Sequence, residues 1–339
     1  MFSILLVPGL IALAYIFRQV VVIGKSCKSN AKLHGKTVII TGKYSLCILT
    51  NMCLLLVTNY FQHAGSNTGI GKATAIEMAK RGARVILACR SKQRGEAALQ
   101  DVKRESGSNK VVFMQLDLGS LKSVHSFAEN FLKSEPRLDI LINNAGLIAF
   151  GRTENGFGMM FGVNHLGHFL LTNLLLDRLK ECGPSRVVNV SSGLHKLGKI
   201  GFDYLNTNKD LGLGTSLLDR FRIYGSSKLC NVLFTHELAK RLQETKVTCY
   251  SLHPGVIKTE LNRNTNSILK IIIKIIGGLL MKNPTQGSQT TLYCALQEGI
   301  EHLSGCYFSN CTAKEVLAKA KDDATAKKLW EISQRFCNL

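Results

Sequence analysis

The sequence predicts an α/β protein built on a doubly wound parallel sheet in a single domain. Runs of strand length that are rich in Val, Ile and Leu occupy residues 36–42, 83–89, 110–117, 138–143 and 186–192. Helix-length stretches of mixed polar and apolar residues separate these runs. Uninterrupted apolar strands that alternate with helices are typical of a parallel sheet that helices cover on both faces. Right-handed crossovers in such a sheet place ligands outside the carboxyl ends of the strands.

The N-terminal segment predicts a membrane anchor helix. Residues 1–24 are mostly apolar apart from Arg18 and Gln19, and about 20 apolar residues are enough to cross a bilayer. The segment has no obvious small-residue cleavage site, which favours an uncleaved anchor over a removed signal peptide. Residues 25–35 are predicted as a basic linker, and positive charge on the cytoplasmic side would place the domain at 36–339 in the cytosol. Arg18 leaves open a helix that only lies on the membrane surface.

An insert interrupts the glycine-containing turn that follows the first strand. Thr41-Gly42 ends the strand and Gly69-Ile70-Gly71 opens the next helix, but the mostly apolar residues 43–66 separate them. Such a turn must be tight for its amides to meet a phosphate at the helix N-terminus. We interpret 43–66 as translated intron, because Gly42-Lys43-Tyr44 can be encoded by a splice-donor-like sequence. A second membrane span and a surface excursion are the alternatives, since loop-closure entropy grows slowly with length.

Tyr224 and Lys228 provide candidate acid–base chemistry. Positions i and i+4 share one face of a helix, so the Lys228 ammonium is expected near the Tyr224 phenol. A neighbouring cation favours the phenolate, and we expect the Tyr224 pKa to fall from about 10 toward the working range. A tyrosine of this kind can exchange a proton with a carbonyl or alcohol oxygen. Ser191 or Ser192 can hold that oxygen, and strand alternation points the two serines to opposite faces.

Taken together, the motifs resemble those of the short-chain dehydrogenase/reductase family. They match in order from about residue 36 to 309: Thr41-Gly42, Gly69-Ile70-Gly71, Asn143-Asn144-Ala145-Gly146, Asn164, Ser192, Tyr224 with Lys228, and His253-Pro254-Gly255. Among subfamilies, the runs 86–90, 161–169 and 227–234 are most similar to the membrane-anchored retinol dehydrogenases. The resemblance implies a Rossmann-like fold at the endoplasmic reticulum membrane. It also implies that the catalytic residues are Ser192, Tyr224, Lys228 and Asn164, with Asn164 bending its helix and holding a water that leads to the lysine.

The residue after the second strand indicates NADP(H) as cofactor. An acidic side chain there would bind the ribose hydroxyls of NAD, but the chain has Arg90, which together with Lys72 can pair with a 2′-phosphate. Solvated surface charges are the alternative reading of both residues. The resemblance adds the other predicted cofactor contacts: Gly42, Asn67, Gly69, Ile70, Gly71, Asp117, Leu118, Asn143, Ala145, Gly146, Tyr224, Lys228, Pro254, Gly255, Val256 and Thr259.

Charge and cysteine content argue against other functional classes. The formal net charge is +20, yet the chain has no nucleic-acid motif and its basic residues are not clustered with aromatics. We therefore expect membrane lipid rather than nucleic acid as a partner. The 11 cysteines form no Cys-x-x-Cys pair, and we interpret them as buried reduced thiols. His165 and His168 lack a third ligand, so we predict no metal site and interpret both as packing or hydrogen-bonding residues.

The predicted function is NADP-dependent hydride transfer between retinol-like alcohols and retinal-like aldehydes, with Tyr224 as general acid/base and a hydrophobic small molecule as substrate. Residues 265–282 are strongly apolar with lysines four apart, and they form either a lid in the membrane interface or a buried helix. One alternative function is a steroid or lipid-aldehyde dehydrogenase of the same mechanism. Another is a membrane-bound nucleotide-fold protein that the insert disables. Whether the chain forms a homodimer is left open.

Overall fold

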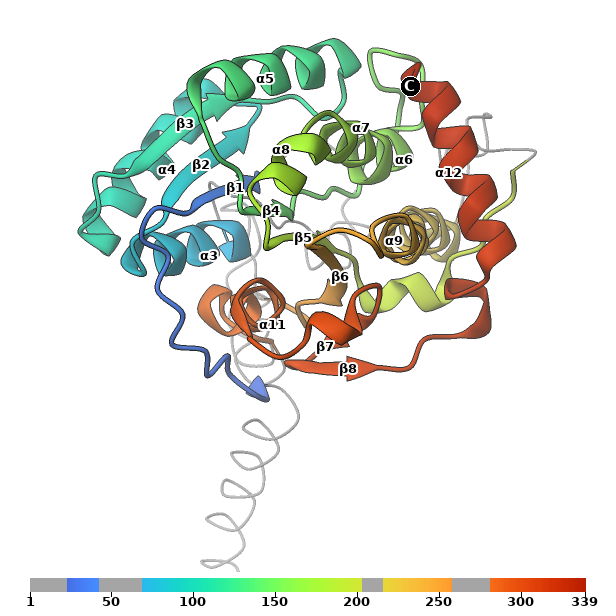
Figure 1. Ribbon diagram of the computed structural model, residues 1–339. Helices are drawn as coiled ribbons and strands as arrows, with labels where there is room; N and C mark the ends of the chain where they lie inside the picture. The colour runs from blue at the N-terminus through green and yellow to red at the C-terminus, as the bar shows by residue number, and fades with distance from the viewer. Residues whose placement is uncertain (1–22, 43–68, 203–215, 258–280) are drawn as a thin grey trace, which may run out of the picture.

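A computed structural model describes residues 23–42, 69–202, 216–257 and 281–339, which form an α/β domain around an eight-stranded sheet (Figure 1). The strands are β1 (Thr37–Thr41), β2 (Arg84–Cys89), β3 (Val111–Gln115), β4 (Ile140–Asn143), β5 (Ser185–Val190), β6 (Val247–His253), β7 (Tyr307–Ser309) and β8 (Thr312–Lys314). Their order is β3-β2-β1-β4-β5-β6-β7-β8, and only the β7–β8 pair is antiparallel. The predicted doubly wound parallel sheet is confirmed. The strand order reverses between β1 and β4, so ligands are expected above the carboxyl ends of these strands.

Helices cover both faces of the sheet, as the apolar strands require. The helical elements are α3 (Gly69–Lys80), α4 (Lys92–Ser106), α5 (Leu121–Ser134), α6 (Met159–Phe161), η2 (Gly162–Leu166), α7 (Gly167–Leu174), α8 (Leu176–Glu181), η3 (Gly193–Leu197), α9 (Leu217–Arg241), α11 (Pro284–Leu296), η5 (Glu301–Leu303), η6 (Ala318–Ala320) and α12 (Asp323–Cys337). Buried side chains of α3, α4 and α11 pack on one face, and those of α5, α7, α9 and α12 on the other (Figure 1). Successive residues of β1 alternate between the two cores: Ile39 joins one, and Val38 and Ile40 join the other.

Local sequence signals set where the main helices begin. Ser91 and Ser120 accept hydrogen bonds from backbone amides at the starts of α4 and α5. Reciprocal capping boxes start α9 at Ser216 and α11 at Asn283. Because α9 carries the candidate residues Tyr224 and Lys228, its cap contributes to the placement of the site.

Several predicted segments lie outside the described residues. These are residues 1–22 of the predicted anchor, all of the insert at 43–66, residues 265–280 of the predicted lid, and the cofactor candidates Asn67 and Thr259. Within the part of the chain that the structure describes, no helix is both long and apolar enough to cross a membrane.

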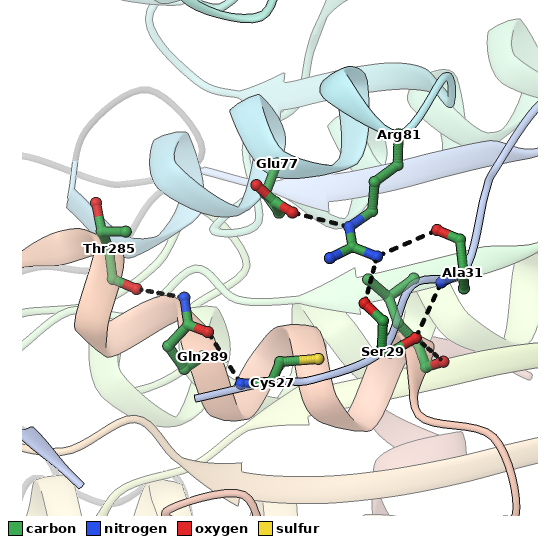
Figure 2. Close-up of polar contacts among 8 residues, drawn as sticks. Cys27, Ser29, Ala31, Glu77, Arg81, Thr285 and Gln289 are labelled. Carbon is green, nitrogen blue, oxygen red and sulfur yellow. Dashed lines mark hydrogen bonds and ion pairs between the residues drawn. The ribbon is translucent and has the colours of Figure 1, made fainter. Parts of the chain in front are cut away.

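The segment predicted as a basic linker lies on the surface of the domain. The Cys27 amide donates to Gln289 Oε1 of α11 at 3.0 Å, and Ser29 Oγ donates to the Leu296 carbonyl at 2.9 Å. Arg81, the residue that follows α3, donates from Nη1 to the carbonyls of Ser29 at 2.7 Å and Ala31 at 3.1 Å (Figure 2). This segment therefore crosses from α11 to α3 and connects two helices of the same face.

We predict that Arg81→Met lowers the free energy of unfolding by about 1–3 kcal/mol, because two backbone carbonyls lose a charged donor. Denaturant unfolding monitored by far-UV circular dichroism measures the change. Arg104→Met is the matched control: Arg104 is 68% exposed, and its ion pair among the described residues is with Asp101 across one helical turn, an interaction worth less than about 0.5 kcal/mol. Equal stability of the two variants would contradict the assigned contacts of Arg81.

Candidate active site

Helix α9 carries Tyr224 and Lys228 on one face, at the carboxyl end of β5. Lys228 is only 2% exposed, and its Nζ donates to the carbonyl of Val190, the last residue of β5, at 2.9 Å. The same Nζ lies 5.9 Å from the centre of the Tyr224 ring. The four-residue spacing on a helix therefore brings the amine and the phenol together as expected.

Ser192 is the serine that contacts Tyr224. Its side chain lies beside the Tyr224 phenol, whose pKa it lowers, and its Oγ accepts from the Leu194 amide at 3.2 Å at the start of η3. Ser191 points elsewhere, since its Oγ donates to the Lys228 carbonyl at 2.7 Å. The two serines thus have different tasks: Ser191 ties β5 to α9, and Ser192 faces the phenol.

Glycines allow α9 to approach η3 closely enough for this contact. A Cβ on Gly225 would lie 2.4 Å from the Leu194 carbonyl oxygen, and a Cβ on Gly198 would lie 2.5 Å from the Gly225 carbonyl oxygen. Neither oxygen can rotate away because both belong to the backbone. The residue next to Tyr224 must therefore be glycine if the helix is to keep its distance from the turn that holds Ser192.

The loop after β4 also lies close to the Lys228 amine. A Cβ on Gly146 would be 2.9 Å from Lys228 Nζ and 3.7 Å from Asn164 Oδ1. Asn164 is fully buried: its Oδ1 accepts from the Leu147 amide at 2.9 Å, and its Nδ2 donates to the Leu147 carbonyl and to Ser227 Oγ, both at 3.0 Å. It lies in η2, a π-helical turn between α6 and α7. Asn164 therefore holds the β4 loop against the helix that carries Tyr224.

Burial dominates the electrostatics of the pair. Desolvation raises the Tyr224 pKa to about 12, partly offset by the hydrogen bond with Ser192. Desolvation lowers the Lys228 pKa to about 7. The expectation that Lys228 lowers the Tyr224 pKa is therefore wrong for this structure, because the buried amine is itself only about half charged at neutral pH. Tyr224 remains a protonated phenol over the physiological range.

Those predicted cofactor residues that the structure describes include glycines next to the carboxyl ends of β1 and β6 and at the start of α3. Gly42 follows β1, Gly69-Ile70-Gly71 begins α3, and Pro254-Gly255-Val256 follows β6. Gly255 has a φ of +98°, and a Cβ there would lie 2.9 Å from the Lys282 side chain. Asp117 Oδ1 accepts from the Gly119 amide at 2.7 Å, and the neighbouring Leu118 is buried.

Both cations predicted to bind a 2′-phosphate have acidic neighbours. Lys72 Nζ lies 2.7 Å from Asp101 and 3.2 Å from Glu105, both on α4. Arg90 Nε lies 4.0 Å from Asp117. Lys72 also borders an open cavity of about 670 Å³ between α3, α4 and α11. A phosphate at this place would have to compete with these carboxylates.

Thr41 at the end of β1 organises the site but was not among the predicted residues. Its Oγ1 accepts from the amides of Asn144 at 2.9 Å and Ala145 at 3.0 Å, and lies 2.9 Å from His168 Nε2. Asn143 links β4 to β5 and α7 by donating to Asn189 Oδ1 and Thr172 Oγ1. Thr41 could have been identified from its hydroxyl at the end of a predicted strand. The later turn Asn144-Ala145 has backbone amides that need such an acceptor.

The histidines have structural roles, as predicted. His165 Nε2 lies 2.9 Å from Ser333 Oγ, and burial lowers the pKa values of His165 and His168 to about 3, so both are neutral. His253 ends β6, and burial lowers its pKa to about 4. Across the described residues no group of His, Cys, Asp and Glu side chains could hold a metal ion.

The chain is similar to several known proteins. The family described as short chain dehydrogenase matches residues 63–207 and 213–269. Dehydrogenase/reductase SDR family member 13 of Bos taurus is 47% identical over 99% of this chain and 82% of its own length. Retinol dehydrogenase 12 and retinol dehydrogenase 14, both of Homo sapiens, are 45% and 42% identical over 91% of this chain, and over 89% and 88% of their own lengths. The crystal structure of an uncharacterized protein from Mycobacterium paratuberculosis is similar with a TM-score of 0.66 and 30% identity, covering 93% of this chain and 98% of that one.

We predict that Gly225→Ala lowers the free energy of unfolding by about 1–3 kcal/mol through overpacking against the Leu194 carbonyl, although alanine gains up to about 1 kcal/mol in a helix. Denaturant unfolding measures the change. Arg222→Ala, at an exposed position of the same turn, is the control and should change stability by less than about 0.5 kcal/mol. A stability of Gly225→Ala equal to wild type would show that α9 and η3 are not in close contact.

We also predict that wild type becomes more stable relative to Lys228→Met as the pH rises from 7 to 9. The folded chain releases the Lys228 proton at about pH 7, whereas the unfolded chain keeps it to about 10.4, so the unfolded state binds more protons in this window. The difference should grow by about 1–3 kcal/mol. Unfolding free energies at several pH values test this, and a constant difference would mean that the buried amine keeps its ordinary pKa.

Proposed function

The chain belongs to the short chain dehydrogenase family, and we propose that it is an NADP-dependent oxidoreductase that interconverts retinol-like alcohols and retinal-like aldehydes by hydride transfer. The observation that carries the proposal is the meeting of Ser192, Tyr224 and Lys228 at the carboxyl end of β5. The similarity to retinol dehydrogenases 12 and 14 supports the choice of substrate.

The residues present fit a nicotinamide dinucleotide. Gly146 leaves open a space next to Lys228 and Asn164 that a side chain would fill, and positive-φ Gly255 keeps the turn after β6 free of a Cβ. The amides at the start of α3 suit a diphosphate. When bound, the reduced nicotinamide supplies the hydride. Arg90, in the place where NAD-binding folds carry an acid, supports the choice of NADP(H).

The side chains of the chain perform the acid–base part of the reaction. Ser192 and Tyr224 hold the carbonyl oxygen between their hydroxyl groups. Tyr224 donates its proton to that oxygen as negative charge develops there, and its pKa of about 12 ensures that the proton is present. Lys228, when protonated, stabilises the phenolate that remains, and would hold a ribose hydroxyl of the cofactor. In the reverse direction the same groups remove the proton of an alcohol.

Asn164 positions the other groups. Two of its side-chain hydrogen bonds are with Leu147 of the β4 loop and one is with Ser227. Ser227 in turn donates to the Tyr224 carbonyl at 2.7 Å. We assign it the task of fixing the loop and the first part of α9 around Tyr224, together with support of proton resupply toward Lys228. The apolar residues at 1–24 and 265–282 support a location at the endoplasmic reticulum membrane with the catalytic domain in the cytosol, where lipid would deliver the substrate.

We predict that Tyr224→Phe lowers kcat for reduction of retinal by about 10²–10⁴-fold, because the proton donor is lost. Its dissociation constant for NADPH, measured by nicotinamide fluorescence, should stay close to that of wild type. Tyr293→Phe in α11 is the matched control and should retain turnover. Turnover by Tyr224→Phe at the wild-type rate would remove Tyr224 from this role, and tighter binding of NADH than NADPH would overturn the cofactor assignment.

A further inference from the structure

Arg220 lies one helical turn before Tyr224 on α9. Residues 220, 224 and 228 are spaced four apart, so the arginine, the tyrosine and the lysine follow one another along one face of the helix. Lys228 occupies the inner end of this row, at the end of β5. Arg220 therefore occupies the outer end, on the far side of Tyr224 from the amine.

The loop after β4 runs alongside residues 228, 224 and 220 of α9, antiparallel to the helix. Its first part meets the inner end, where Gly146 lies against Lys228 Nζ. Four residues later the loop meets the outer end, where the Phe150 ring lies 4.6 Å from the centre of the Arg220 guanidinium. Tyr224 lies between these two contacts. A substrate whose carbonyl meets Tyr224 therefore has the guanidinium of Arg220 on one side of it.

The guanidinium has buried donors without acceptors. Neither Nε nor Nη1 of Arg220 is exposed, and neither has a hydrogen-bond partner in the described part of the chain. The neighbouring acid, Asp219, is occupied by Ser216 and by Arg222, whose Nη1 lies 3.2 Å away. The Phe150 contact engages the π-face of the ring with the cation and satisfies no N–H group. Buried polar groups are nearly always hydrogen-bonded, so these donors indicate a ligand.

We propose that Arg220 binds a carboxylate of the substrate. The proposal rests on the proposed function and adds to its apolar substrates a second class, alcohols and aldehydes that carry a carboxylate near the reacting carbon. An arginine forms short, charge-assisted hydrogen bonds with a carboxylate, which an apolar chain cannot offer. Since neighbouring side chains on this face start about 6 Å apart, the carboxylate lies only a few bonds from the carbonyl.

The test compares ω-oxo carboxylic acids of about four to ten carbons with their methyl esters, a range chosen to bracket that separation of about 6 Å. The full chain is assayed in detergent with NADPH and with NADH. For the best length, kcat/KM of wild type should be about tenfold or more higher for the acid than for the ester, the factor that a hydrogen bond to a charged group supplies. Arg220→Met should lose this preference while keeping its rate with the ester, and Arg220→Lys should keep part of it.

Arg222→Met is the matched control, because Arg222 lies on the exposed side of the same turn at 66% exposure. It should keep the preference for the acid. Equal kcat/KM values for acid and ester in wild type would overturn the proposal, and so would an Arg220→Met variant that loses both activities equally, since a purely structural arginine acts in that way.

Calorimetric titration of hexanedioate into the cofactor-loaded chain separates this inference from the proposed function. If wild type reduces no aldehyde but binds hexanedioate about tenfold more tightly than Arg220→Met does, the proposed oxidoreductase activity fails and the carboxylate site stands. If neutral aldehydes are reduced but wild type and Arg220→Met bind hexanedioate equally, the activity stands and the carboxylate site is refuted.

Discussion

The packing of α9 on the carboxyl end of β5 is the constraint on which the site depends. Ser191 donates to the Lys228 carbonyl, and Lys228 donates back to the Val190 carbonyl, so strand and helix are joined by two hydrogen bonds in opposite directions. Both lie in the buried interior, where a lost partner costs about 1–3 kcal/mol, more than an ordinary hydrogen bond contributes. Gly225 lets the helix come this close. With the helix fixed in this way, the distance between Ser192 and Tyr224 is set.

A second polar network fixes the opposite wall. Thr41 ends β1 at the point where the strand order reverses, and its hydroxyl accepts the two amides of the Asn144-Ala145 turn. Asn164 then holds Leu147, two residues after Ala145, through the amide and the carbonyl of Leu147. A loop bound at both ends has little freedom, and Gly146, at its centre, comes within reach of the Lys228 amine. Hydrogen bonds of Thr41 and Asn164, and not apolar packing alone, therefore build this wall of the site.

Desolvation rather than charge pairing decides the protonation of the catalytic pair. Burial favours the neutral form of both the Tyr224 phenol and the Lys228 amine. The pKa of the phenol therefore rises to about 12, and the pKa of the amine falls to about 7. This suits a site whose charge arrives with a ligand, since an incoming anion or polarised carbonyl would favour the charged amine. Arg220 differs from this pair because two of its buried donors, Nε and Nη1, have no hydrogen-bond partner among the described residues.

The sequence alone determined the parallel sheet and the Tyr224–Lys228 pair, because strand hydrophobicity and a four-residue helical spacing are local properties of the chain. It also indicated Ser192, through the end of an apolar run and a family resemblance. Only the tertiary structure decided that Thr41 joins β1 to the β4 turn, that Asp101 pairs with Lys72, and that the basic segment beyond residue 24 lies against α11. These contacts join residues that are separated in the chain, and they form only when the helices pack on the sheet. For the same reason burial, which no sequence spacing encodes, reversed the expected shift of the Tyr224 pKa.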